Sequence, residues 1–139
     1  MQHYLNAMKK YATFKGRASR TEYWMFTLVQ IAIVIAFFGV MVLDGLNGQA
    51  GPVSGAAAIG LILFVLIHVL PNIAISVRRI HDFDTTGWLY LTVFVPFIGG
   101  FMPIVFGCIS PTDGPNQYGP DPRGGATLED LNAFGPASA

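Results

Sequence analysis

Cysteine is almost absent from this chain, because Cys108 is the only one among 139 residues. An intramolecular disulfide and a CxxC metal or redox pair are therefore excluded. Charge is scarce too: Lys, Arg, Asp and Glu make up 12% of the residues, whereas apolar residues make up 53%. A soluble globule of this length needs helices with one polar face, so this composition favours a chain in contact with lipid.

Charged residues are missing altogether from three long stretches, at 23–43, 55–77 and 87–109. At about 1.5 Å per residue, each stretch is long enough to cross a hydrocarbon core about 30 Å thick. The sequence therefore predicts an all-α integral membrane protein with three transmembrane helices in one membrane domain, 23–109. The third stretch is interrupted by Pro and Gly, so its helix should kink, and a broken or re-entrant helix is an alternative there; these residues are Pro96, Gly99, Gly100, Pro103 and Gly107. A cleaved signal peptide explains the first stretch poorly, since the stretch and its basic leader are both too long.

Basic residues are confined to the flanks of these stretches. Seven of the eight lie before the first stretch or directly after the second, at Lys9, Lys10, Lys15, Arg17, Arg20, Arg78 and Arg79. Cytoplasmic loops of membrane proteins carry the excess of Lys and Arg, so this pattern predicts a cytoplasmic N-terminus. Three crossings then place the C-terminal tail on the periplasmic or extracellular side. Basic residues arranged in this way do not form the single charged face that binds nucleic acid.

Two segments flank the predicted membrane domain. In the cytoplasmic segment 1–22, apolar residues recur at helical spacing over 3–15, which predicts an interfacial amphipathic helix with its lysines toward anionic lipid. Ser19-Arg20-Thr21-Glu22 has the pattern of a capping box directly before an apolar run. The segment 110–139 is rich in Pro and Gly and predicts a turn-rich tail.

Three sequence elements carry a family resemblance: FKGRASRTEYW at 14–24, RRIHD with a later Gly-Trp at 78–88, and PTDGPNQYGPDP at 111–122. They resemble the F-x-G-R-A-x-R-x-E-[FY]-W opening, the R-R-L-H-D…S-G-W segment and the G-x-N-x-[FY]-G-x-D-P close of the DUF805 family. The resemblance implies a multi-spanning bacterial inner-membrane protein and brings no established enzymatic activity. The chain departs from the family pattern at 83–86, where FDTT replaces a small-glycine-basic-serine run and weakens the case for phosphate binding by this loop.

Positive-inside topology places a polar cluster at the cytoplasmic interface. The members of this cluster are Arg17, Arg20, Glu22, Arg78, Arg79, His81 and Asp82. Four interpretations are open. The arginines and carboxylates pair with one another and tie the N-terminal segment to the second loop. Alternatively, unpaired arginines bind an anionic lipid headgroup or a partner, the arginines are snorkelling anchors, or the cluster has a catalytic or sensing role with His81 as its pH-sensitive member.

A second polar group lies within the spans, with Gln30 in the first and His68, Asn72 and Ser76 at i, i+4 and i+8 in the second. Such groups either form hydrogen bonds between helices or line a wet path for a solute or proton. No second His or Cys stands at ligand spacing from His81, and the tail lacks the spacing of an EF-hand, so we expect no metal and no cofactor.

The sequence predicts a non-enzymatic scaffold or accessory component of the lipid bilayer, with no catalytic residue. One alternative is a small transporter or channel that uses His68, Asn72 and a broken third span. A second is a membrane enzyme that acts on a phosphate-bearing lipid through His81 and Asp82, although no nucleophile–base pair is visible. Small residues, at Ala32 and Ala36 and again at Gly99 and Gly107, favour close helix approach and a homo-oligomer.

Overall fold

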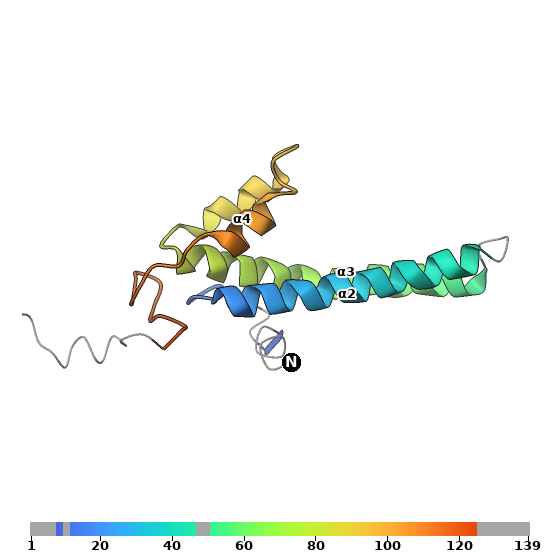
Figure 1. Ribbon diagram of the computed structural model, residues 1–139, viewed down its shortest axis with the longest axis horizontal. Coiled ribbons are helices and arrows are strands. Elements are labelled where there is room, and N and C mark those ends of the chain that lie inside the picture. Colours follow the sequence, from blue (N-terminus) through green and yellow to red (C-terminus); the bar gives the residue numbers. More distant parts are fainter. Residues whose placement is uncertain (1–7, 10–11, 47–50, 125–139) are drawn as a thin grey trace, which may run out of the picture.

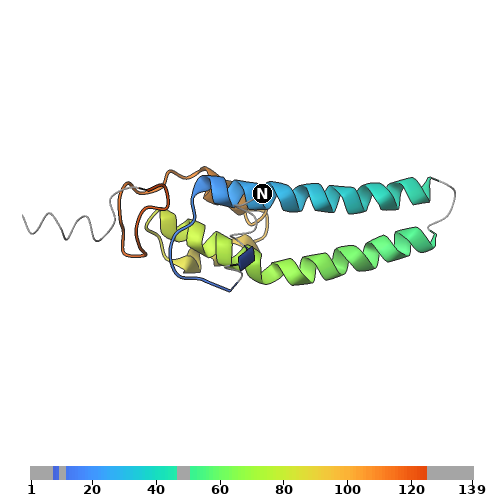
Figure 2. The same ribbon diagram turned by 90° about the horizontal axis from the view of Figure 1, so that it is seen from below.

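The computed structural model describes residues 8–9, 12–46 and 51–124, so most of the predicted interfacial helix at 3–15 lies outside the described residues. Within the described part, the named elements are all helical: α2 (Arg20–Gly45), α3 (Pro52–Asp82), the 3₁₀ helix η1 (Gly87–Phe94) and α4 (Met102–Cys108). The helices α2 and α3 run antiparallel along each other, and η1 and α4 lie against one end of this pair (Figures 1 and 2).

Helix α2 begins where the sequence predicts. The Ser19 Oγ accepts a hydrogen bond from the backbone N–H of Glu22 at 3.2 Å, as an N-cap should. The Glu22 carboxylate does not return to Ser19 but forms an ion pair with Arg78, so only half of the predicted capping box is used. With 26 residues α2 is about 39 Å long, which is sufficient to cross a membrane.

Helix α3 has 31 residues and continues through Pro71 and past the predicted end of the second span. Arg78, Arg79 and His81 are therefore helical residues rather than loop residues. The helix stops where Asp84 takes a left-handed conformation, φ 57°, which a short polar side chain tolerates better than most. Both α2 and α3 have the length and apolar composition of a membrane span.

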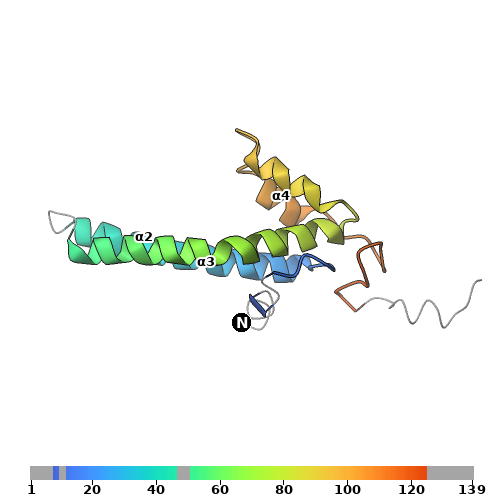
Figure 3. The ribbon, with the colours of Figure 1, turned by 180° about the vertical axis from the view of Figure 1, so that it is seen from behind.

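The predicted third span is not a continuous helix, and three spans are not confirmed. Residues 87–109 form η1, a turn and the short α4, and both helices lie on the same side of the α2–α3 pair (Figures 1 and 3). Eight 3₁₀ residues rise about 16 Å and seven α-helical residues about 10 Å, so neither piece crosses a core of about 30 Å.

The break between η1 and α4 has a local cause. Pro96 and Pro103 lack a backbone donor, and Gly99 packs directly on the preceding turn, where an added Cβ would lie 1.9 Å from the Val93 carbonyl oxygen. The Gly99 N–H donates to the Val95 carbonyl at 2.8 Å and closes the turn. A count of uncharged residues cannot detect this reversal.

The far ends of α2 and α3 are joined by a cap that the sequence analysis did not predict. The Asp44 Oδ2 accepts hydrogen bonds from the backbone N–H groups of Gly51 and Ser54, each at 2.9 Å, and from the Ser54 hydroxyl at 2.6 Å. The last turn of α2 thereby supplies the N-terminal cap of α3.

The buried core lies at the opposite end of the helix pair, where α2, α3 and α4 meet. It consists of Ala18, Tyr23, Phe26, Ile75, Ile80 and Phe106. Beyond it, the far halves of α2 and α3 expose apolar side chains such as Ile35 and Ile62, as expected of surfaces in contact with lipid. The buried core therefore lies at one end of the α2–α3 pair, the end at which Arg17, Arg78 and Arg79 also lie.

Candidate functional site

The centre of the candidate site is the fully buried carboxylate of Asp82 at the end of α3. Its Oδ1 accepts a hydrogen bond from Arg17 Nε at 2.8 Å, and its Oδ2 is paired with the Arg79 guanidinium. All three side chains are nearly or completely inaccessible to solvent. We call Arg17, Asp82 and Arg79 the clasp.

The remaining N–H groups of the clasp arginines donate to backbone carbonyls. Arg17 reaches the carbonyls of Thr112, at 2.8 Å, and Gly114 in the tail. Arg79 reaches those of Phe106, at 3.0 Å, and Ile109 at the end of α4. The clasp therefore joins four parts of the chain: the N-terminal segment, α3, α4 and the tail.

Contacts of the tail with Arg17 and Asp82 change the predicted topology. The Asp82 carbonyl accepts hydrogen bonds from the backbone N–H of Thr112 at 2.9 Å and from its hydroxyl at 3.1 Å. The sequence analysis placed the tail across the membrane from Arg17. Residues 110–124 lie instead at the same end of the helix pair as Arg17, because the chain reverses between η1 and α4.

The other predicted cluster residues surround the clasp. Arg78, nearly inaccessible, forms an ion pair with Glu22, and its Nε is buried without a hydrogen-bond partner among the described residues. Arg20 donates to the carbonyls of Cys108 and Ile109 and to the Ser110 hydroxyl. The predicted pairing of arginines within the chain is therefore present.

His81 belongs to a different environment from its neighbour Asp82. Its ring stacks on Tyr118 with 3.8 Å between centroids and an angle of 2° between planes. Its Nδ1 lies 3.3 Å from the Gly16 carbonyl oxygen. Adjacent helical residues point in different directions, so His81 and Asp82 do not form the pair that a catalytic role would require.

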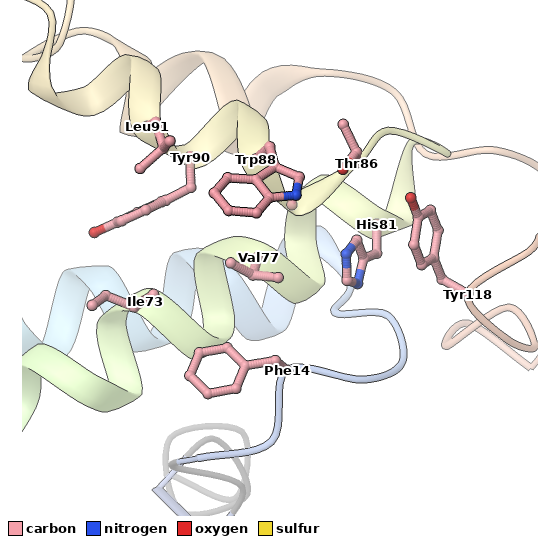
Figure 4. Close-up of a pocket in the computed structure, with 10 residues that line it drawn as sticks. Phe14, Ile73, Val77, His81, Thr86, Trp88, Tyr90, Leu91 and Tyr118 are labelled. Atoms are coloured by element: carbon pink, nitrogen blue, oxygen red, sulfur yellow. The ribbon is translucent and has the colours of Figure 1, made fainter.

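A pocket of about 540 Å³ lies beside His81, between α3 and η1, and is also bordered by the N-terminal segment and the tail. Figure 4 shows the His81 ring at one end of it, with Trp88 alongside. The lining residues are Phe14, Ile73, Val77, His81, Thr86, Gly87, Trp88, Tyr90, Leu91 and Tyr118. Sequence reasoning missed this pocket, because its aromatic residues come from segments far apart in the chain.

Two residues of the polar group within the spans, Gln30 and Asn72, form a contact between helices. The Asn72 amide donates to Gln30 Oε1 at 2.9 Å, which links α3 to α2. The His68 Nδ1 lies 2.8 Å from the Phe64 carbonyl, and its ring packs on the Phe64 ring. Ser76 is buried on the same helix. The interhelical hydrogen bond that the sequence predicts is present.

The tail has its own ion pairs around Arg123. Its guanidinium bonds to Asp121 at 2.7 Å and to Asp113 at 3.1 Å. The hydrogen bond from Arg123 lowers the pKa of Asp121 to about 2, and Asp121 and Asp113 raise the pKa of Arg123. The Asn116 side chain accepts from the Tyr118 N–H at 2.9 Å, the Asx turn expected here. Within the described ranges no three His, Cys, Asp or Glu residues are placed to hold a metal ion.

Comparison with known proteins agrees with the resemblance. The family described as "Protein of unknown function (DUF805)" matches residues 11–120. The chain is 44% identical to the inner membrane protein YhaI of Escherichia coli K12, over 91% of this chain and 99% of YhaI. It is 41% identical to the inner membrane protein YhaH of the same strain, over 88% of this chain and 98% of YhaH. No solved structure matches the chain.

Proposed function

The chain belongs to the DUF805 family, and from this premise we propose that it is a non-enzymatic scaffold or accessory component of a bacterial inner membrane. In this role the clasp holds together a folded head, which we define as residues 12–24, 73–94 and 102–124. The head is the part that meets another membrane component. The proposal depends on one observation: the buried Asp82 carboxylate is paired with two arginines, Arg17 and Arg79.

Buried charges of this kind fit a structural role. Taking a carboxylate and two guanidiniums out of water is costly, and removing one partner from such a group typically destabilises a protein by about 3–5 kcal/mol. The clasp arginines also donate to carbonyls of α4 and the tail, at 3.0 Å from Arg79 to Phe106 and 2.8 Å from Arg17 to Thr112. Their guanidiniums are thus occupied within the protein and leave little to offer a lipid phosphate.

The head lies at the cytoplasmic end of the helix pair in this proposal. Arg17, Arg20, Arg78 and Arg79 all lie at the head end of the helix pair, and cytoplasmic ends carry the excess of basic residues. Helices α2 and α3 cross the membrane, while η1 and α4, which belong to the head, enter it from the cytoplasmic side and return. The exposed Phe94, Phe97 and Phe101 around the turn suit contact with lipid.

The two alternatives have less support. A transporter needs solvent between its polar groups, and Gln30 and Asn72 instead bond directly to each other at 2.9 Å. An enzyme that used His81 and Asp82 together needs them to face one substrate. Asp82 is enclosed in the clasp, while His81 stacks on Tyr118 beside the pocket.

The experiment that tests the scaffold role is photo-crosslinking in intact cells. A photoreactive amino acid at Gln117, exposed on the head, should give a discrete protein adduct. The same group at Leu63, exposed on the far half of α3, is the matched probe of a lipid-facing surface. The adduct mass separates a second copy of this chain from another protein.

The clasp provides the control for this experiment. Asp82→Asn should abolish the Gln117 adduct, whereas Lys15→Ala, a change at an exposed basic residue, should leave it intact. The absence of any discrete adduct at Gln117, in cells where the protein is inserted, would contradict the scaffold role. If the adduct still forms in the Asp82→Asn variant, the contact with the partner does not depend on the clasp.

A further inference from the structure

The lining of the pocket beside His81 changes in polarity along the axis of α3. Ile73, Val77 and His81 follow each other at i, i+4 and i+8 on one face of α3, so the pocket runs about 12 Å along the helix. Ile73 lies further from the clasp along α3, and in the proposed topology closer to the membrane midplane, than His81. Thr86 and Tyr118 join His81 at the head end, and Leu91 lies toward the Ile73 end (Figure 4). The Tyr90 hydroxyl, toward the Ile73 end, is the exception to this gradient.

A lipid in the bilayer has the same gradient in the same direction. Its polar headgroup lies at the surface and its acyl chains extend toward the midplane. The pocket volume of about 540 Å³ falls within the roughly 300–1,000 Å³ of typical small-molecule sites. Trp88 and Leu91 are 76% and 53% exposed, so the pocket opens to the surroundings along η1. A lipid can place one chain and its headgroup inside and leave the second chain in the bilayer.

The lining also selects the charge of the headgroup. None of the ten lining residues is a Lys, Arg, Asp or Glu. An anionic headgroup would therefore find no basic partner among them, and a net-neutral zwitterionic headgroup suits the lining better. Two aromatic rings, from Trp88 and Tyr118, lie at the His81 end of the pocket, and aromatic rings attract ammonium groups.

His81 offers an acceptor for such an ammonium group. The Gly16 carbonyl beside Nδ1 can only accept a hydrogen bond, so Nδ1 must carry a proton to bond to it. In the neutral ring Nε2 is then an acceptor. This Nε2 lies beside Gly87, another lining residue, since a Cβ added to Gly87 would be 3.2 Å from it.

We propose that this pocket binds one phospholipid with an ammonium headgroup, phosphatidylethanolamine, with its ammonium group at His81 and one acyl chain along Ile73 and Leu91. The proposal does not rest on the scaffold role, because a lipid in this pocket is compatible with any activity of the head. It is also distinct from anionic-lipid binding by the arginine cluster.

Native mass spectrometry of the full chain tests this proposal. Protein in detergent is mixed with phosphatidylethanolamine or, separately, with phosphatidylglycerol of the same acyl chains. We expect one phosphatidylethanolamine per protomer to stay bound under conditions at which phosphatidylglycerol is lost. Equal retention of the two lipids, or a preference for phosphatidylglycerol, would overturn the proposal.

Two variants locate the lipid. Ile73→Trp fills the chain end of the pocket, and His81→Phe removes the acceptor but keeps a ring to stack on Tyr118. Each should weaken phosphatidylethanolamine binding about tenfold or more, in keeping with loss of a hydrogen bond to a charged group or of the chain site. Leu63→Trp adds the same side chain to an exposed position of α3 away from the pocket and should retain the lipid.

Ile73→Trp adds volume beside the core, so the folding of each variant must be verified before its lipid binding is interpreted. Each variant is compared with the wild type by thermal unfolding in detergent, and His81→Phe serves as the second measurement if Ile73→Trp unfolds. Wild-type retention of phosphatidylethanolamine by a folded His81→Phe variant would show that His81 does not hold the headgroup. The proposal would then be wrong.

Discussion

Arg17 Nε and Asp82 Oδ1 lie 2.8 Å apart in a buried ion pair, although 65 residues separate them in the sequence. The pair links the segment before α2 to the end of α3. The same carboxylate is paired with Arg79, so one buried negative charge is shared by two positive ones. The stability of the head therefore depends on this single carboxylate more than on any other polar side chain of the clasp.

Asp82→Asn is expected to destabilise the protein by about 3–5 kcal/mol, because it leaves two buried guanidiniums without a carboxylate. Thermal or denaturant unfolding in detergent measures the change. Asp84→Asn is the matched control, since Asp84 is exposed two residues away and Asn tolerates its left-handed φ of 57°. Equal losses of stability in the two variants would show that the clasp has no special role.

The reversal between η1 and α4 predicts which side of the membrane Ser110 faces. In a Cys108→Ser background, Ser110→Cys should react with a membrane-impermeant maleimide only when the cytoplasmic side is open. Leu46→Cys, exposed at the far end of α2, should react from the opposite side. A third crossing by residues 87–109 predicts that both cysteines react from outside.

Gly107→Ala should destabilise the contact between α4 and α2 by about 1–3 kcal/mol through overpacking. An added Cβ would lie 2.5 Å from Trp24 Cζ2, and Trp24 Nε1 also donates to the Gly107 carbonyl at 3.2 Å. Gly100→Ala, where nothing lies within 4 Å of an added Cβ, is the control. Unfolding followed by tryptophan fluorescence measures both variants, and equal stability would rule out this close packing.

The tail should loosen at acidic pH because of Asp121. Its pKa is lowered to about 2 by the hydrogen bond from Arg123, against an unfolded value of about 3.9. A lowered folded-state pKa stabilises the fold above pH 4, and this contribution is lost as the pH falls from about 4 through 2. Hydrogen exchange at 112–123 measures the loosening. In the Asp121→Asn variant this pH dependence of hydrogen exchange should disappear. If it is unchanged in the variant, another titratable group causes it.

Much of the fold follows from local sequence patterns. The start of α2 depends on Ser19, and the two apolar stretches that form α2 and α3 are recognised by length alone. The third apolar stretch passes the same test and fails in the structure, since Gly99 and its two neighbouring prolines reverse the chain. Length and composition measure whether a segment can cross a membrane, not whether its backbone runs straight.

The sequence names residues of the polar cluster but does not predict how they are arranged. Topology alone brings Arg17 and Asp82 to one interface, yet it cannot say that Asp82 is shared or that His81 turns away from it. The pocket was missed because Phe14, Trp88 and Tyr118 meet only after the whole chain has folded. Tyr118 in particular lies in a segment whose composition predicts only turns.

The spacing of the clasp along the chain sets an order for biosynthesis. Arg17 is synthesised 65 residues before Asp82 and 95 residues before Thr112, its acceptor in the tail. The Arg17 guanidinium can therefore reach its partners only after α3 and the tail have left the ribosome. Because Arg17 and Thr112 meet at the same end of the helix pair, the proposed topology requires no passage of the tail through the bilayer. A chain cut short before Thr112 would contain α2 and α3 and yet lack the acceptors that complete the head.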